Sequence, residues 1–327
     1  MDTHPLSTSR IAKIYNTNSD KLQKAYKHNL SDYNSWRHKS HAEDWILYGK
    51  NLGKYLSIDE TSLSKGELYT IVTNKEALGQ KGTIVAMIKG TRSEDVIRVL
   101  EKLPLSRRNM VKEVTLDMAA NMNLIAKRCF KKAMIVTDRF HVQMLASEAV
   151  QEQRIKYRWE AISQENKMMK ESKSTGYSYQ AEVLSNGDTV RQLLARSRHL
   201  LFKSPSKWTI SQSERAVLLF ERYPRIYQAY KLSQSLSGVF SSCTNKDTAR
   251  LELAKWYQEV EKANFESFQV ISRTIYHHYD KILNYFINRS TNASAESFNA
   301  KIKDFRRQFR GVKDIPFFLY RLSKLYA

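Results

Sequence analysis

The chain has 327 residues, 42% of them apolar, and its 54 Lys and Arg outnumber its 33 Asp and Glu to give a formal net charge of +21. This length and apolar content exclude a disordered tail and are typical of one large globular domain or two ordinary ones. The two cysteines, Cys129 and Cys243, are too few for a disulfide framework or a cysteine-based zinc ribbon.

The excess of positive charge predicts a polyanionic partner. Solubility alone would be served by a net charge of about +2 to +8, and the basic residues lie along the whole chain instead of in one tail. An anionic membrane is a weaker candidate, because no basic amphipathic anchor adjoins an apolar segment and no apolar run approaches the ~18 residues of a membrane span. No apolar stretch typical of a signal peptide follows Met1, so we expect a reduced, cytoplasmic protein.

The early part of the chain predicts a short helical segment and then a small sheet. Residues 1–53 form the helical segment, with one or two short helices in 19–36. Three runs of alternating apolar and polar side chains, separated by glycine-containing turns, predict an antiparallel meander. The runs are 54–61, 67–74 and 83–89.

Helices and strands alternate after the meander. The predicted elements are a helix at 93–103, a strand at 112–117, a helix at 118–130 and a strand at 133–138. The order β-β-β-α-β-α-β predicts an α/β fold, with a mixed sheet of three antiparallel strands and then parallel strands. Three of the strands end at a carboxylate: Asp59, Asp117 and Asp138.

From about residue 142 the pattern is helical. Residues 247–287 contain no Gly or Pro and carry apolar residues at spacings of three and four, and another helix begins near Pro224. The last segment, 292–326, predicts a helix that ends at Gly311 and a shorter helix after it.

Three acids are candidates for one site: Asp59, Asp117 and Glu296. If their strands are neighbours, Asp59 and Asp117 emerge at one edge of the sheet, and Glu296 lies in the first turn of a helix that can pack across that edge. Converging carboxylates repel unless a cation balances them, and Mg²⁺ prefers oxygen ligands. For each acid taken alone, an ordinary loop cap or ion pair is the better explanation, and only the set favours a metal site.

Two further groups of side chains are weaker candidates. Asp138 and His141 are three residues apart, which is compatible with one helix face but is more often a cap or a buried hydrogen bond. A basic run in the last segment is compatible with a DNA-binding helix face or with a plain solvated face. Its residues are Lys301, Lys303, Arg306, Arg307 and Arg310.

Five stretches of this sequence resemble, in order and spacing, the DDE insertion-sequence transposases of the ISL3 type, which are related to the Mutator-like transposases. The stretches are LSIDETSLSKGELYTIV (56–72), IKGTRSEDVIRVL (88–100), VTLDMAANM (114–122), IVTDRFHV (135–142) and NASAESFNAKIKDFRRQFRGV (292–312). The resemblance covers roughly residues 45 to 327.

The resemblance implies an RNase H-like core, 54–141 and 291–327, interrupted by a helical insertion at 142–290. It also implies a bacterial, nucleoid-associated enzyme that cleaves DNA at transposon ends and transfers the cut strand to target DNA. In such an enzyme, Asp59, Asp117 and Glu296 would hold two Mg²⁺ or Mn²⁺ ions. Asp138 and His141 match a supporting element of the family, although Asp138 is an alternative to Asp117 as the second ligand.

The resemblance further implies a homo-oligomer on paired DNA ends. Longer relatives carry an N-terminal zinc-binding and helix-turn-helix region, whereas about 54 residues without a Cys precede the first strand here. End recognition is therefore expected from a separate N-terminal DNA-binding polypeptide, or is lost. Two alternatives stay open: an inactive or partial transposase that only binds DNA, and an RNase H-like nuclease without strand transfer.

Overall fold

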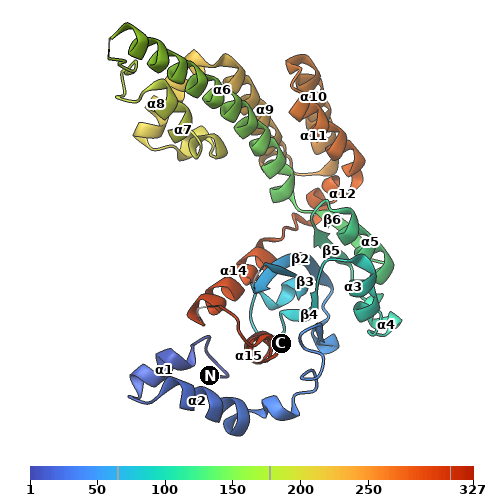
Figure 1. Cartoon of the computed structure of the whole chain (residues 1–327). Coiled ribbons are helices and arrows are strands. Elements are labelled where there is room, and N and C mark those ends of the chain that lie inside the picture. The colour runs from blue at the N-terminus through green and yellow to red at the C-terminus, as the bar shows by residue number, and fades with distance from the viewer. Residues whose placement is uncertain (65, 177, 310) are drawn as a thin grey trace. The chain divides into compact units, whose positions relative to one another are not determined.

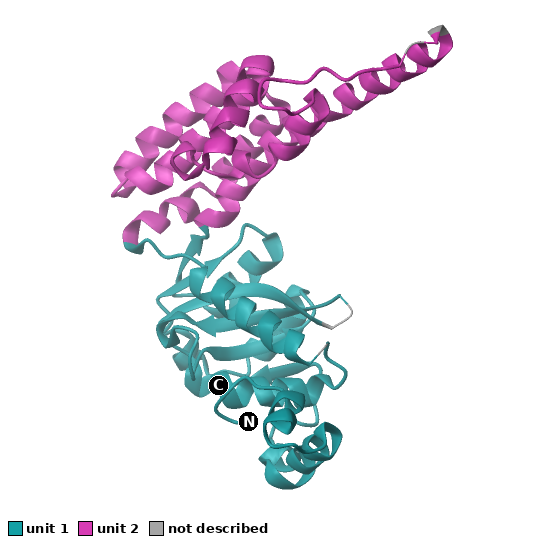
Figure 2. Ribbon diagram, turned by 90° about the vertical axis from the view of Figure 1, so that its left-hand side faces the viewer, with its two compact units in different colours: residues 1–138, 288–327 teal, residues 139–287 magenta. Residues whose placement is uncertain are grey.

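A computed structural model gives the fold of the chain and describes residues 1–64, 66–176, 178–309 and 311–327. The chain divides into two compact units (Figures 1 and 2). Unit 1 comprises Met1–Asp138 and Asn288–Ala327, and unit 2 comprises Arg139–Ile287. Unit 1 is therefore built from two stretches of chain, which the residues of unit 2 separate in sequence.

Unit 1 contains a mixed sheet of the predicted kind. The strands are β1 (Trp45–Leu47), β2 (Tyr55–Ser64), β3 (Glu67–Asn74), β4 (Ile84–Lys89), β5 (Glu113–Leu116) and β6 (Met134–Thr137). Their order across the sheet is β1-β4-β3-β2-β5-β6. The first four strands pair antiparallel, whereas β5 pairs parallel with β2 and β6 pairs parallel with β5. The predicted α/β fold, an RNase H-like mixed sheet joined to a large helical region, is confirmed.

The first predicted strand is longer than the sequence indicated. It was expected to end beside Asp59, but β2 continues to Ser64 because it forms a hairpin with β3, and Asp59 lies opposite Ile71 within that hairpin. Only the parallel pairing with β5 stops early, at Ser57 and Thr115. Strand β1 was not predicted, since three residues at a sheet edge are too few to give a periodic pattern.

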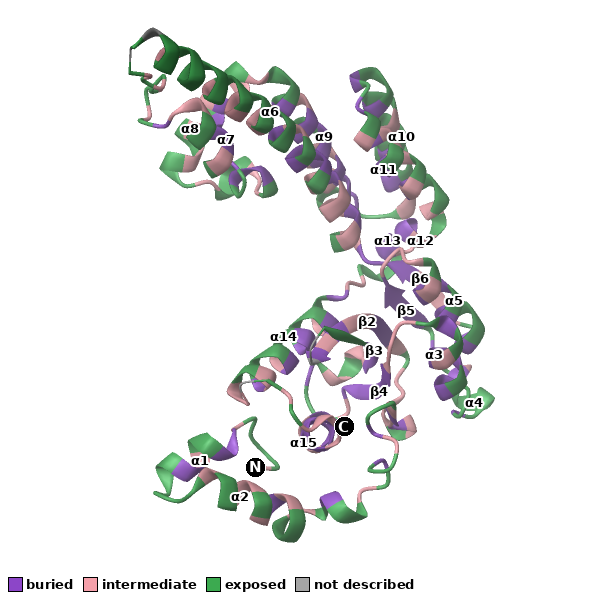
Figure 3. Cartoon of the chain, viewed as in Figure 1, coloured by how far each residue is buried: buried purple, intermediate pink, exposed green. Residues whose placement is uncertain are grey.

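Two hydrophobic cores lie on the two faces of this sheet, and Figure 3 colours the buried residues purple. On one face, Ile58 of β2 and Leu116 of β5 pack with the apolar sides of α3 (Ser93–Leu100) and α5 (Ala120–Cys129). On the other face, Ile71 of β3 packs with Phe298 and Ile302. These two residues belong to α14 (Ala293–Gln308), which is followed by α15 (Ile315–Tyr326). Burial of each such side chain contributes about 1.5–3 kcal/mol.

The N-terminal segment of unit 1 packs on α15. It contains α1 (Thr8–Ile14), α2 (Ser19–Ala25) and two short irregular helical turns, η1 (Tyr26–Leu30) and η2 (Asp32–Ser35). Arg321 of α15 is 0% exposed and donates hydrogen bonds to the carbonyls of Met1 and Leu6 at 2.9 and 3.1 Å. The ring of Tyr26 lies 5.2 Å from the same guanidinium. A buried cation thus fixes the backbone of the first residues.

The described residues of unit 2 form helices, the turns and loops between them, and one short bridge. Its main helices are α6 (Arg139–Thr175), α7 (Val190–Arg196), α8 (Ile210–Arg222), α9 (Pro224–Ser242), α10 (Lys246–Ala263) and α11 (Glu266–His277), and α12 (Tyr279–Leu283) and α13 (Tyr285–Asn288) follow. Helix α9 begins at Pro224, as predicted. The expected helical region 247–287 is broken after α10, where Asn264 takes a left-handed conformation with φ of 52°. Within the described part of the chain, no helix combines the length and hydropathy needed to cross a membrane.

Glu113 of β5 is buried and binds Asn288, the residue at which the chain returns to unit 1. Its carboxylate accepts hydrogen bonds from Lys75 at 3.0 Å and from Asn288 at 3.1 Å. Burial would raise the pKa of Glu113, but hydrogen bonds from Ser290 and Asn288 and the charge of Lys75 outweigh it, and the pKa lies below its ordinary value. The ionised side chain therefore stabilises the folded unit.

We predict that Glu113→Gln lowers the free energy of unfolding at neutral pH by about 3 kcal/mol, because Lys75 loses its buried counter-charge. Since the folded pKa of Glu113 lies below 4.5, its stabilisation is full above that pH and is lost as the pH falls through the folded value. Urea unfolding followed by circular dichroism between about pH 7 and pH 3 measures both effects.

The matched control is Glu101→Gln, which removes a surface carboxylate 3.6 Å from Arg128 and should change stability by less than about 0.5 kcal/mol. Below pH 4.5 the wild type should lose stability more steeply than the Glu113 variant. Parallel pH profiles for the two proteins would contradict this role of Glu113.

Candidate active site

Asp59 of β2 and Asp117, the first residue after β5, come from two strands that pair in parallel. The ladder between β2 and β5 pairs Tyr55 with Glu113 and ends with Ser57 opposite Thr115, so Asp59 and Asp117 each lie two residues beyond its last pair. Because strand side chains alternate in direction, both acids share the face of Ser57, which is the face toward α14. Both are half-buried. The prediction that Asp59 ends its strand is wrong, because β2 continues to Ser64, and the pairing of the two acids in one site stays a prediction.

Each of these carboxylates also accepts a hydrogen bond from a nearby donor. One oxygen of Asp59 accepts from the backbone N–H of Glu60 at 2.8 Å, and the other accepts from the side-chain amide of Asn299 at 2.7 Å. Asp117 accepts from the backbone N–H of Ala119 at 2.9 Å. These donors hold both carboxylates in fixed orientations at the edge of the sheet.

The pKa of Glu60 is raised, in part by the negative charges of neighbouring acids. Burial raises its pKa most, the neighbouring charges of Asp117 and Asp59 raise it further, and a hydrogen bond with Asn121 lowers it only in part. One carboxyl group thus feels both acids at once. Such crowding is the electrostatic environment that a bound divalent cation relieves.

Three polar contacts hold helix α14 on β2, and the residues of the α14 segment that make them are seven positions apart. Ser57 donates to the side-chain oxygen of Asn292, Asn299 donates to Asp59, and Arg306 donates to the carbonyl of Ser62 at 2.9 Å. Seven residues make about two helical turns, so the three contacts lie on one side of the helix. The ribbon of α14 runs beside β2 in Figure 1.

Glu296 lies on this same side of α14. It follows Asn292 by four residues and precedes Asn299 by three, which places it between two side chains that contact β2. The side chain of Glu296 is exposed. Among the described residues, no three or more His, Cys, Asp or Glu side chains are close enough together to hold a metal ion. The fold thus brings Asp59 and Asp117 to one edge and Glu296 to the facing helix, without joining the three in one cluster.

Asp138 directly follows β6, as Asp117 directly follows the neighbouring strand β5. The ladder between β5 and β6 ends with Leu116 opposite Thr137, and the N–H of Asp138 donates to the carbonyl of Leu116 at 2.9 Å. Asp138 is 1% exposed, whereas Asp117 is half-buried, so solvent and a hydrated ion reach Asp117 more readily. His141 is half-buried in the first turn of α6 in unit 2, with its ring edge-on to Phe140.

The predicted basic run divides into two groups. Lys301 donates to the carbonyl of Gly79 at 2.9 Å and Arg306 donates to that of Ser62, so both cations bind the backbone of unit 1. Lys303 is exposed, and Arg307 is exposed beside Asp304. Arg310 lies outside the described residues.

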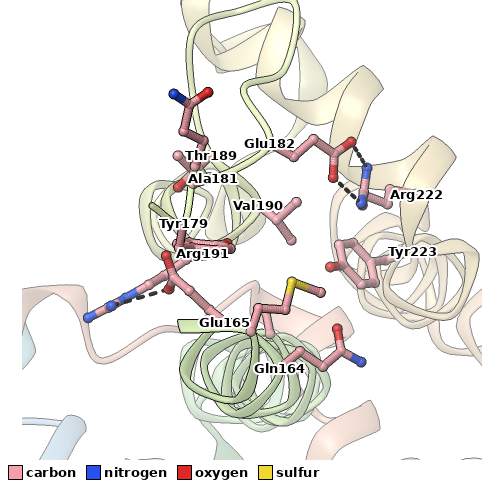
Figure 4. Close-up of a pocket in the computed structure, with 13 residues that line it drawn as sticks. Gln164, Glu165, Tyr179, Ala181, Glu182, Thr189, Val190, Arg191, Arg222 and Tyr223 are labelled. Carbon is pink, nitrogen blue, oxygen red and sulfur yellow. Dashed lines mark hydrogen bonds and ion pairs between the residues drawn. The ribbon is translucent and has the colours of Figure 1, made fainter. Parts of the chain in front are cut away.

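Unit 2 contains a cavity of about 430 Å³, drawn in Figure 4. Helix α6, residues 179–182, the start of α7 and the junction of α8 with α9 line it. Arg222 donates two hydrogen bonds to Glu182 at 2.7 and 2.8 Å, and Arg191 donates to Glu165 at 3.3 Å. These pairs neutralise the charges of the wall, which makes the cavity a poor match for a phosphodiester.

Sequence reasoning did not select Asn292 and Asn299, the two amides that flank Glu296. One signal was available in the spacing, because an acid with an amide four residues before it and another three residues after it presents all three on one helix face. Amides alone are too common on helices for that spacing to point to a site. Only the contacts with Ser57 and Asp59 give it a meaning.

Comparisons with known proteins point to a transposase family. A transposase family model, that of the ISL3-type DDE transposases, matches residues 56–322, a range that includes Asp59, Asp117 and Glu296. A transposase for insertion sequence element IS1001 of Bordetella parapertussis is 23% identical over 274 residues, which are 84% of this chain. The chain spans 61% of the length of that relative, and no solved structure matches. Since the family model covers most of its length, the chain belongs to the ISL3 family of DDE transposases.

Proposed function

We propose that this chain is a DNA transposase in which unit 1 performs metal-dependent cleavage of transposon ends and strand transfer to target DNA. The observation that supports the proposal is the parallel ladder of β2 and β5, which ends at Ser57 and Thr115, two residues before Asp59 and Asp117. We assign Glu296, an exposed residue in the first turn of α14, as the third acid. Family membership supports DNA as the substrate.

The donor set fits Mg²⁺ or Mn²⁺. Two carboxylates about 4 Å apart repel by roughly 4 kcal/mol at an effective dielectric constant near 20, and hard cations that prefer oxygen ligands balance such a charge. Asp59, Asp117 and Glu296 would hold the ions. Bound metal would make a water molecule more acidic and would stabilise the charge on the leaving oxygen of a phosphodiester.

The proposed reaction has two in-line steps at phosphorus. In the first, a water oxygen bonds to the phosphorus at the transposon end, the P–O3′ bond breaks, and the freed 3′ oxygen takes a proton. In the second, that 3′-hydroxyl loses its proton and bonds to a target phosphorus, and the target's P–O3′ bond breaks. The acids position the reacting phosphate, and no covalent intermediate with the protein is needed.

The basic surface serves to bind the DNA backbone. The net charge of +21 attracts a polyanion, and the exposed cations of α14, Lys303 and Arg307, lie on the helix that carries Glu296. The matched relative is longer than this chain. Recognition of the ends by a separate polypeptide and assembly of several copies on paired ends belong to the same proposal.

We predict that Asp59→Asn abolishes Mg²⁺-dependent cleavage, because one acid of the set loses its charge, and that DNA affinity stays within about twofold of the wild type. Cleavage is measured on duplexes that span the DNA flanking the gene, and affinity is measured by gel shift. The control is Asp95→Asn, which removes a surface carboxylate paired with Arg98 on α3 and should leave both properties unchanged.

The products of this experiment separate the possible functions. Joined products with target DNA support a transposase, and cleaved ends without joined products indicate a nuclease. Cleavage by Asp59→Asn at the wild-type rate would refute the assignment of the acids. A wild-type protein that binds the DNA but does not cut it would point to a DNA-binding protein alone.

We predict that Lys303→Ala and Arg307→Ala each reduce the slope of log K against log salt concentration by about 0.9, since each removes one phosphate contact. Lys301→Ala is the control, because its ammonium donates to the carbonyl of Gly79. Fluorescence anisotropy with a labelled duplex at several salt concentrations gives the slopes. Equal slopes for all four proteins would remove this helix from the DNA interface.

A further inference from the structure

We propose that Asn299 is a positioning residue that fixes the carboxylate of Asp59 for metal binding and links it to the helix that carries Glu296. The inference rests on the proposed function, because it takes Asp59 as a metal ligand. It adds a residue outside the three acids, whose role is to orient one of them.

The contacts of Asn299 are those of an orienting group. Its side-chain nitrogen lies 2.7 Å from one oxygen of Asp59 and 3.4 Å from the carbonyl oxygen of Glu60. Both neighbours are acceptors, so the amide must present its NH₂ group to them. Asn299 is 9% exposed, which shields this hydrogen bond from water.

Asp59 is thereby held from two sides. The N–H of Glu60 binds one carboxylate oxygen at 2.8 Å and Asn299 binds the other. The two donors select the plane of the carboxylate, and only Asn299 comes from a side chain that a mutation can remove.

The position of Asn299 on α14 links Asp59 to Glu296. The two residues are three apart, which puts their side chains on one face with a rise of about 4.5 Å between them. A hydrogen bond at residue 299 therefore helps to fix both the rotation and the height of the helix at Glu296. Removing it loosens the orientation of Asp59 and the placement of Glu296 together, while the N–H of Glu60 and the contacts of Asn292 and Arg306 remain.

Asn292 provides a matched comparison on the same helix. It also holds α14 on β2 and is 1% exposed, but its partner is the hydroxyl of Ser57 and not a carboxylate. Loss of either amide weakens the docking of α14 by about one hydrogen bond. Only loss of Asn299 removes a direct partner of a proposed metal ligand. The two variants thus separate docking from orientation of the ligand.

The experiment measures Mn²⁺ binding to the full chain by electron paramagnetic resonance of the free ion, in the absence of DNA. Outer partners of metal ligands typically contribute 10- to 100-fold to affinity, so Asn299→Ala should weaken the site lost in Asp59→Asn by about tenfold or more. Asn292→Ala should stay within about threefold of the wild type. Asn299→Ser, which keeps a donor, should recover part of the loss. Thermal unfolding of each variant reports docking.

Each outcome decides between the possibilities. A selective loss of Mn²⁺ affinity in Asn299→Ala, with similar thermal shifts for both alanine variants, supports the positioning role. Equal Mn²⁺ affinities in Asn299→Ala and Asn292→Ala would overturn it, and the proposed function would stand as long as Asp59→Asn has lost the site. Unchanged Mn²⁺ binding by Asp59→Asn would overturn the proposed function itself, and this inference with it.

Discussion

The docking of α14 on β2 is the constraint on which the candidate site depends. Apolar burial of Phe298 and Ile302 supplies most of the attraction, but apolar packing alone permits a helix to slide or rotate by part of a turn. The contacts of Asn292, Asn299 and Arg306 with Ser57, Asp59 and Ser62 remove that freedom, because each is specific to one position along the strand. The helix is therefore fixed in register, and this register places Glu296 in its first turn.

The same physical logic explains why acids cluster in a chain of such positive charge. The cations are distributed over the surface, where they cost little and attract DNA. Asp59 and Asp117 instead accept hydrogen bonds from backbone donors, and Asp59 also accepts one from Asn299. In the proposed function, the cations attract the DNA and these acids hold the metal ions.

Much of unit 1 could be predicted from the sequence, because strand periodicity and turn residues report local structure. The meander and the parallel strands follow from that pattern. The end of β2 could not be predicted from that pattern, since the length of a strand in a hairpin depends on its partner strand as well as on its own composition. The hydrogen bonds from Lys301 and Arg306 to backbone carbonyls could not be predicted either. A basic side chain that binds a carbonyl and one that lies in solvent give the same sequence pattern. The role of Asn299 needed a contact across 240 residues, which no local pattern encodes.

The interruption of unit 1 by unit 2 has a consequence for biosynthesis. The sheet is complete once β6 leaves the ribosome, yet one of its apolar faces stays uncovered until α14 and α15 have been made. The nascent chain must therefore keep that face from aggregating while the whole of unit 2 is translated. The entropic cost of bringing α14 back to the sheet grows only slowly with the length of the intervening segment. The third acid arrives with the closing helix. A ribosome that stalls before α14 would release a polypeptide that exposes this apolar face and lacks Glu296, so translation sets the moment at which the proposed site can form.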